Sequence, residues 1–201
     1  MTILEDAKSL AERVTGYRRP DRAALSSLTN ARKPRAYRFR DDGETPNNPR
    51  LPLLHYRSAV KLPANYDPAA VFEALFARHG WTDSWRDGIY PFLHFHTETH
   101  EVLGIARGAV SARFGGARGR VLHLKPGDVV VLPAGTGHRR IRASRDLLVV
   151  GAYPQGGRYD EPKPRDIDHD EAVARIAKVK LPRTDPVYGR SGPLKQFWRM
   201  R

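Results

Sequence analysis

The chain has 201 residues, no cysteine, a hydrophobic content of 40% and a formal net charge of +13 at pH 7. The length predicts one sizeable core, the apolar content excludes a disordered chain, and the lack of cysteine excludes disulfides and thiolate metal sites. No run approaches the ~18 consecutive apolar residues of a membrane span, and the N-terminus does not resemble a signal peptide, so we expect a cytoplasmic protein with no membrane segment.

The positive charge is concentrated at the two ends. Residues 1–40 hold ten Lys and Arg against four Asp and Glu, and residues 190–201 hold four basic and no acidic residues. Basic ends can contact nucleic acid through its phosphates, but no nucleic-acid-binding motif accompanies them. We therefore do not expect nucleic acid as the principal partner, since solvated arms or contacts with a partner subunit also explain the charge.

The first part of the chain predicts helices and isolated strands separated by turns. Residues 2–14 combine capping-box spacing with an apolar stripe, which predicts a helix that ends at Gly16 and leads into an arginine-rich connection. The other elements predicted before residue 81 are strands in RAYRFRDDG (35–43) and LLHYRSAVKL (53–62), and a helix from Asp67-Pro68 to Gly80.

From residue 81 to residue 153 the pattern becomes a series of short β-rich runs. These runs are IYPFLHFH, EVLGIARGAVSARF, RVLHLK, DVVVLP, HRRIRA and DLLVVGAY. Short strands at this spacing, separated by Gly, Pro and Asp turns, predict an antiparallel sandwich or barrel. A short helix is predicted over residues 168–178. We expect a helix and basic linker in 1–35, a single barrel domain in 36–190, and a basic tail in 191–201.

The stretch HFHTETHE, residues 94–101, concentrates metal-ligating side chains. His94 and His96 are two residues apart, so on a strand their imidazoles share one face. Glu101 has the wrong parity for the same strand, so a turn through residues 97–100 must place it at the start of the next strand. His138 follows the tight PAGTG turn and can reach the same face. We expect His100 in the turn or on the surface.

Three imidazoles and one carboxylate suit one divalent iron, manganese, nickel, cobalt or zinc ion, and leave open positions for water, dioxygen or substrate if the ion is octahedral. Isolated histidines are more often surface residues or hydrogen-bonded core residues, which is the alternative to a metal site.

The spacing of these residues resembles the paired motifs of the cupin superfamily. The first block runs from Gly88 through His94, His96 and Glu101 to Gly108; the second runs from Gly127 through Pro133-Ala134-Gly135 to His138. The second block usually ends in Asn, where this chain has Arg142. Segments such as YRFRDDGETPNNPRLPLL, GDVVVLPAGTGH and VVGAYPQGGRYD look like the YjlB-like group of single-domain cupins.

The resemblance implies a mainly β fold, the antiparallel double-stranded β-helix or jelly-roll barrel, with helical and extended decorations at both ends. It also implies a homodimer and the metal ligands His94, His96, Glu101 and His138. It assigns no substrate.

Four further residues are candidates for a substrate pocket. By strand parity Tyr90 and Phe92 share a face with His94, although they could equally belong to the barrel core. Arg140 and Arg142 share parity with His138, and would select an anionic ligand if they pointed inward.

The leading hypothesis is therefore a metal-dependent enzyme, a dioxygenase, isomerase or lyase, acting on a small polar metabolite, with no catalytic residue yet assigned. A non-catalytic module that senses a small molecule is the alternative, and nucleic-acid binding through the basic ends ranks third.

Overall fold

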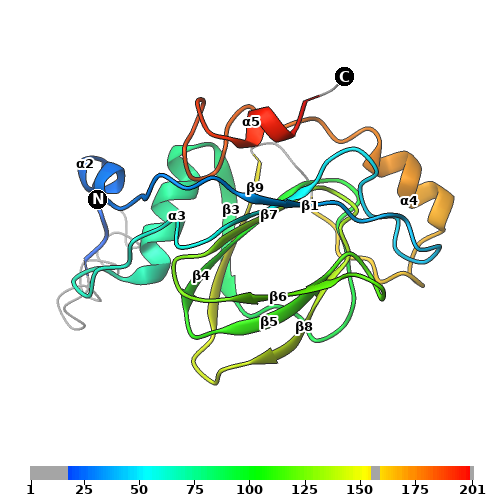
Figure 1. Ribbon diagram of the computed structural model, residues 1–201, viewed down its shortest axis with the longest axis horizontal. Helices are drawn as coiled ribbons and strands as arrows, with labels where there is room; N and C mark the ends of the chain where they lie inside the picture. Colours follow the sequence, from blue (N-terminus) through cyan, green and yellow to red (C-terminus); the bar gives the residue numbers. More distant parts are fainter. Residues whose placement is uncertain (1–17, 155–158, 200–201) are drawn as a thin grey trace, which may run out of the picture.

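Two antiparallel sheets face each other and form the body of the protein in a computed structural model that describes residues 18–154 and 159–199 (Figure 1). The larger sheet has the strand order β1-β2-β7-β4-β9-β3, and the smaller has the order β6-β5-β8. The strands are β1 (Arg35–Tyr37), β2 (Leu53–Tyr56), β3 (Trp81–Asp87), β4 (Glu101–Arg107), β5 (Val110–Phe114), β6 (Arg120–Leu124), β7 (Val129–Leu132), β8 (His138–Ala143) and β9 (Leu148–Pro154). This arrangement confirms the predicted mainly β jelly roll. The helix predicted over residues 2–14 lies outside the described residues.

The run VVVL in β7 shows how the sequence specifies the layers. Val129 and Val131 pack into the core on the helical side of the six-stranded sheet, whereas Val130 and Leu132 pack between the two sheets. Successive side chains of a strand point to opposite faces, so a strand buried on both faces reads as a continuous apolar run. The same alternation applies to β4, where Leu103 faces the inter-sheet core.

Four helices are described: α2 (Arg22–Ser27), α3 (Pro68–Arg78), α4 (His169–Ile176) and α5 (Leu194–Phe197). The predicted start of α3 is confirmed, because Asp67 accepts a hydrogen bond from the Ala69 backbone and Pro68 occupies the first turn. Phe72 of α3 lies over Gly104 of β4, where a Cβ atom would come within 2.4 Å of the Phe72 ring. Glycine at this position therefore allows the helix to pack closely on the sheet.

Some predicted elements differ from the structure. The run IYPFLHFH forms no regular strand; it passes through an extended segment in which His94 alone makes a β-bridge, to His138. Pro91 in this run has no N–H to donate to a strand ladder. In LLHYRSAVKL only Leu53–Tyr56 is a strand. The arginine-rich connection contains α2, whose Leu25 is buried in the core. None of the described helices is long and apolar enough to cross a membrane.

Candidate metal centre

Three histidines converge at one end of the space between the sheets. His94 and His96 lie on the segment before β4, and His138 begins β8. Backbone hydrogen bonds join the two segments: His94 N donates to His138 O at 3.3 Å, and His138 N donates to His94 O at 2.9 Å. All three imidazoles are buried, and one ligand atom from each lies within 4.8 Å of the others. The structure thus brings together the three predicted histidines.

The ring Nδ1 atom of each histidine lies against a backbone carbonyl. The pairs are His94 with Phe92 O (3.3 Å), His96 with Asp160 O, and His138 with Thr136 O (3.1 Å). A carbonyl oxygen can only accept a hydrogen bond, so each Nδ1 carries the proton and donates it. This orients each ring so that Nε2 is the nitrogen available to a metal ion, as in histidines that bind metal through Nε2.

Glu101 supplies a carboxylate to the same centre. It begins β4, on the face that also carries Leu103, and its side chain is buried. Its Oε2 lies 3.3 Å from His96 Nε2 and 3.4 Å from His138 Nε2. Yet neither His96 Nε2 nor Glu101 Oε2 has a directed hydrogen-bond partner among the described residues. A buried polar atom without a partner is costly, and a cation bound between these atoms would satisfy both. The donor set therefore fits a metal ion.

The histidines differ in basicity. Burial by itself would lower the pKa of His96, but the Glu101 carboxylate and the Asp160 carbonyl outweigh it and raise that pKa to about 9. Burial lowers the pKa of His94 and holds that of His138 well below its ordinary value. Without metal, a single proton on His96 therefore faces Glu101 at neutral pH. A divalent cation would take the place of that proton.

Asp160 fixes the loop that carries His96. Its side chain accepts hydrogen bonds from the Thr97 backbone at 2.8 Å, the Thr97 hydroxyl at 2.6 Å and the Glu98 backbone at 3.2 Å. Its own carbonyl accepts from His96 Nδ1. One residue therefore orients both the imidazole and the chain that follows it, the position that outer-sphere partners of metal ligands occupy.

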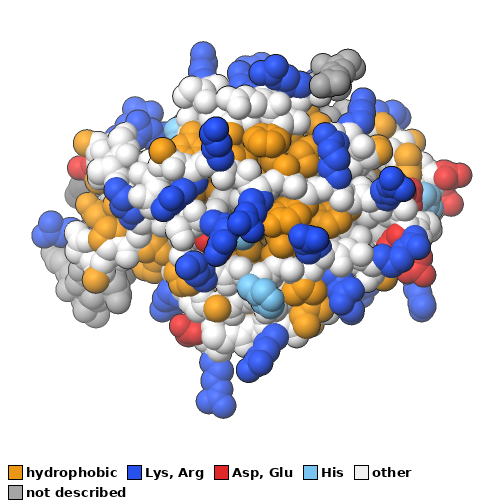
Figure 2. Space-filling view, in the orientation of Figure 1, with side chains coloured by type: hydrophobic (Ala, Val, Ile, Leu, Met, Phe, Trp, Pro, Cys, Tyr) orange, Lys and Arg blue, Asp and Glu red, His pale blue; other side chains and the backbone are white. Residues whose placement is uncertain are grey.

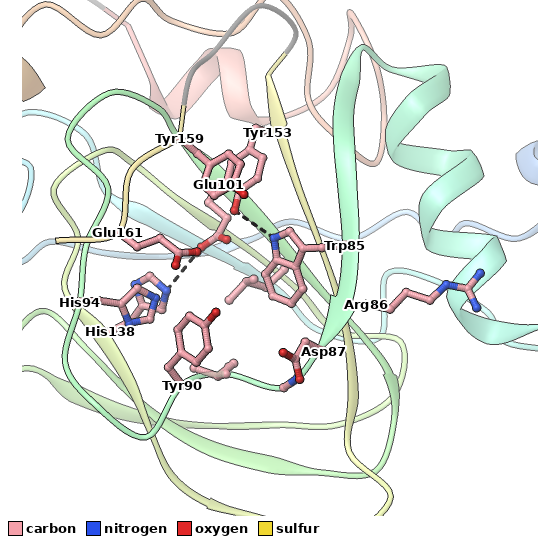
Figure 3. A pocket seen from close by; sticks show the side chains of 13 residues that line it. Trp85, Arg86, Asp87, Tyr90, His94, Glu101, His138, Tyr153, Tyr159 and Glu161 are labelled. Atoms are coloured by element: carbon pink, nitrogen blue, oxygen red, sulfur yellow. Dashed lines mark hydrogen bonds and ion pairs between the residues drawn. The ribbon is translucent and has the colours of Figure 1, made fainter. Parts of the chain in front are cut away.

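A cavity of about 210 Å³ opens beside the histidines (Figure 3). Its walls come from the end of β3, the segment before β4, β4 itself, β9 and the residues after β9; the lining residues are Trp85, Arg86, Asp87, Gly88, Ile89, Tyr90, His94, Glu101, Leu103, His138, Tyr153, Tyr159 and Glu161. Figure 3 shows Arg86 directed away from the cavity, where its guanidinium pairs with Glu73 and Asp67. The cavity wall is thus acidic and aromatic.

Tyrosines form one side of this cavity. Trp85 Nε1 donates to the Tyr153 hydroxyl at 3.0 Å, and the Tyr159 ring stacks on Tyr153 with centroids 5.0 Å apart. Burial, reinforced by Glu101, raises the pKa of Tyr153, so its hydroxyl stays protonated. Because the oxygen accepts from Trp85, the hydroxyl hydrogen remains available to an acceptor in the cavity.

The four predicted pocket residues lie in different places. Tyr90 lines the cavity, and its ring contacts that of His94 with centroids 5.3 Å apart. Phe92 stacks on Tyr90 at 4.7 Å but is not among the lining residues. Arg140 is half-buried and Arg142 is exposed, and neither is a lining residue. The anion selectivity that inward-pointing arginines would confer therefore has no structural basis in this cavity.

His100 lies in the connection before β4, which was one of its two predicted positions, but the other prediction, a place on the surface, was wrong. Its side chain is buried, with 1% of its surface exposed. Its Nδ1 accepts a hydrogen bond from the Ala134 backbone at 2.9 Å, and its ring lies against that of Trp198 with centroids 4.7 Å apart. Trp198 is almost a hundred residues further along the chain, so local turn propensity could not reveal that the C-terminal segment covers His100.

Several site residues carried no recognisable local signal. Asp160, Tyr159 and Glu161 follow β9 in an irregular segment, and they reach the site only through the tertiary fold. The one sequence signal that included any of them was the segment VVGAYPQGGRYD, which contributed to the family resemblance. Strand parity could have identified Tyr153 as a residue of the cavity wall, because side chains two residues apart on β9 point to the same face of the sheet.

Comparison with known proteins identifies the family of the chain. The chain is 40% identical to the uncharacterised protein YjlB of Bacillus subtilis (strain 168) over 167 residues, which are 83% of this chain and 98% of that protein. The chain belongs to the YjlB-like group of cupins. No family model matches the chain.

Solved structures show partial likeness. Acireductone dioxygenase from Bacillus anthracis, with a cadmium ion in its active centre, is 19% identical with a TM-score of 0.33, covering 48% of this chain and 68% of that one. The formate complex of oxalate decarboxylase from Lactobacillus farciminis is 16% identical with a TM-score of 0.34, covering 69% of this chain and 34% of that one. These likenesses are too partial to bear on function.

Proposed function

We propose that this cupin is a metal-dependent enzyme acting on a small polar metabolite, with His94, His96, Glu101 and His138 holding one divalent metal ion. The observation that carries the proposal is a cluster of three buried histidines, two of which place Nε2 within 3.4 Å of a buried Glu101 oxygen that has no hydrogen-bond partner among the described residues. Imidazole and carboxylate ligands suit iron, manganese, nickel, cobalt or zinc. Bound there, the ion would supply Lewis acidity and open positions for substrate or water.

The cavity favours a small substrate rich in hydroxyl groups. Its 210 Å³ is below the ~300–1,000 Å³ of most ligand pockets. Asp87 and Glu161 line it together with tyrosines, while Arg86, the one arginine among the described residues that line it, is turned outward and paired with acids. This charge pattern disfavours a polyanionic substrate and suits a neutral or singly charged molecule.

Two residues of the cavity are suited to handle protons. Glu161 and Tyr90 line the same cavity, and the negative charge of Glu161 raises the pKa of the Tyr90 hydroxyl. We assign Glu161 the acceptance of a proton from a substrate hydroxyl, because it lines the cavity and is not required as a metal ligand. Tyr153, held by Trp85, would donate a hydrogen bond that orients the substrate.

A substrate screen on metal-loaded protein tests the proposal. The protein is incubated with small diols, sugars and 2-hydroxy acids, and turnover is followed by proton NMR and an oxygen electrode. We expect turnover of at least one compound, lost in His138→Gln and slowed by about 100-fold or more in Glu161→Gln, the scale of general acid–base catalysis. Glu98→Gln is the matched control, because Glu98 is an exposed acid of the same region that lines no part of the cavity.

Binding of a panel compound without any turnover would instead support the alternative, a non-catalytic module that senses a metabolite through the same cavity. The observation that separates the two is product formation, because both require the cavity and the metal.

We also propose a homodimer in the cytoplasm. Both sheets end in strands with an unpaired edge, since β3 has a single partner in one sheet and β6 a single partner in the other, among the strands of the described residues. Such edges are commonly covered by a second copy. Light scattering coupled to size-exclusion chromatography would give twice the 22.7 kDa chain mass for a dimer, and the mass of one chain would exclude it.

A further inference from the structure

A second cavity, on the other side of the strand that carries Glu101, has the features of an anion site. It has a volume of about 760 Å³ and lies among the segment after β1, α4, α5 and their connection; its lining residues are Arg38, Asn48, Arg50, Leu51, His100, Ile176, Val179, Leu181, Gln196, Phe197 and Arg199. Figure 1 shows β1, α4 and α5 on the same side of the molecule. Of the described residues, three arginines and no acidic residue line this cavity, in contrast to the metal pocket.

We propose that this cavity binds a small anion bearing a carboxylate or phosphate group, independently of the metal centre. His100 and the guanidinium groups of Arg38, Arg50 and Arg199 would be its ligands.

His100 provides a buried donor at the cavity wall. Its Nδ1 accepts the Ala134 N–H, so the ring proton lies on Nε2. Nε2 is buried and makes no well-aligned hydrogen bond to a described residue; its polar neighbour among these residues is the Lys180 backbone, which forms a weak contact with the ring. Trp198 packs against the ring and limits its rotation. An oxyanion in the cavity would give this N–H a charged acceptor, which makes a stronger hydrogen bond than a backbone carbonyl.

The three arginines are positioned but not neutralised. Arg38 donates to the Arg50 carbonyl at 2.6 Å, Arg50 donates to the Ala177 carbonyl at 3.4 Å, and Arg199 donates to the Lys195 carbonyl at 3.3 Å. None of the three forms an ion pair with a residue in 18–154 or 159–199, unlike Arg86 and Arg175, which do.

Each guanidinium has five N–H donors, so a single carbonyl contact at each arginine leaves donors for a ligand. Arginine binds carboxylate and phosphate through paired, charge-assisted hydrogen bonds. The chain carries a formal net charge of +13, and Figure 2 shows Lys and Arg side chains distributed over the face in view. A positive field of this kind attracts anions to the protein surface.

The floor of the cavity is held by Asn48. Its side-chain nitrogen donates to the Ala134 carbonyl at 3.0 Å, and its oxygen accepts from the Arg50 and Leu51 backbones at 3.2 Å and 2.9 Å. Ala134 therefore links Asn48 to His100, which receives the Ala134 N–H. This linkage fixes the buried donor relative to Arg50 before any ligand binds, so little ordering is required on binding.

The test is isothermal titration of the full-length protein with inorganic phosphate and, separately, with succinate, against sodium chloride at equal ionic strength. We expect saturable binding of at least one of the two anions, weakened by tenfold or more in Arg38→Gln/Arg50→Gln. Arg118→Gln, which changes an exposed arginine outside both cavities, should bind as the wild type does. Stronger binding of phosphate than of succinate would indicate a phosphorylated ligand, and the reverse a carboxylate.

Nitrogen-15 NMR of the histidine rings gives a second readout that needs no substitution at His100. We expect the Nε2 signal of His100 to shift as the anion saturates, while the signal of His123, an exposed histidine bonded to Ser111 on the smaller sheet, does not. No binding beyond that of chloride, equal affinity in the double variant, or an unmoved His100 signal would each overturn the proposal.

Discussion

Replacing Asp160 by alanine probes the part of the metal centre that lies outside the ligands themselves. The substitution removes the acceptor of three hydrogen bonds, from the Thr97 backbone, the Thr97 hydroxyl and the Glu98 backbone. Thr97 is fully buried, so the substitution leaves its N–H and its hydroxyl without their protein acceptor. The backbone contact of His96 Nδ1 to residue 160 then depends on a segment that is no longer anchored.

The expected size of the effect follows from these contacts. A hydrogen bond to a charged group contributes about 1.5–3 kcal/mol to stability. Only part of the free energy of the three hydrogen bonds that Asp160 accepts acts on the orientation of His96. Loss of an outer partner of a metal ligand typically weakens metal binding by about 10–100-fold, or roughly 1.4–2.7 kcal/mol. We expect Asp160→Ala to fall in that range. Asp160→Asn should lose less, because the amide oxygen can still accept from the Thr97 and Glu98 backbones.

Competition with a chromogenic zinc chelator measures the dissociation constant in each variant. Asp168→Ala is the matched control, because Asp168 likewise caps a backbone N–H group, at the start of α4, but has no described contact with the metal segment. The control should lose about 1 kcal/mol of stability and no metal affinity. Wild-type zinc affinity in a folded Asp160→Ala protein would refute the positioning role.

The remaining predictions concern pH and packing. Because the pKa of His96 is about 9 in the absence of metal and the ion must displace that proton, zinc affinity should rise by up to about tenfold per pH unit between about pH 6 and 8; a flat profile would show that no proton is displaced. Gly104→Ala forces a Cβ to within 2.4 Å of Phe72 and should lower the free energy of unfolding in urea by about 1–3 kcal/mol, whereas Gly88→Ala, whose nearest neighbours are 3.7 Å away, should change it by less than about 0.5 kcal/mol. Burial lowers the pKa of His100 to about 4, below its value in the unfolded chain. The contribution of the neutral His100 to the free energy of unfolding is therefore complete above about pH 6.5, and up to about 3 kcal/mol of it is lost as the pH falls toward 4. In His100→Gln the free energy of unfolding should fall less steeply with decreasing pH, by that amount, and an unchanged slope would contradict the assignment.

Local rules predicted much of the fold and part of the centre. Strand parity required a turn between His96 and Glu101 and placed Glu101 at the start of a new strand, which is where β4 begins. The helix start at Asp67-Pro68 follows from capping chemistry that involves only neighbouring residues. These features depend on interactions within a few residues, which a sequence displays directly.

Features that depend on distant segments were not predictable in the same way. Trp198 packs against the buried ring of His100 from 98 residues away, and Asp160 orients His96 across 64 residues. The segment before β4 has a β-bridge only at His94, although its alternating composition favours a strand; its pairing with β8 depends on how the two segments meet in the fold. In each case tertiary packing, and not local propensity, decides the conformation.

The central claim is that HFHTETHE supplies metal ligands, and elemental analysis tests it most directly. Protein is purified without added metal or chelator, and wild type is compared with His96→Ala and with the exposed-histidine control His123→Ala. The account predicts close to one divalent ion per chain in wild type and in the control, and a sharp loss in His96→Ala. Absence of metal from the wild type, even after reconstitution with iron, manganese, nickel, cobalt and zinc in turn, would contradict it.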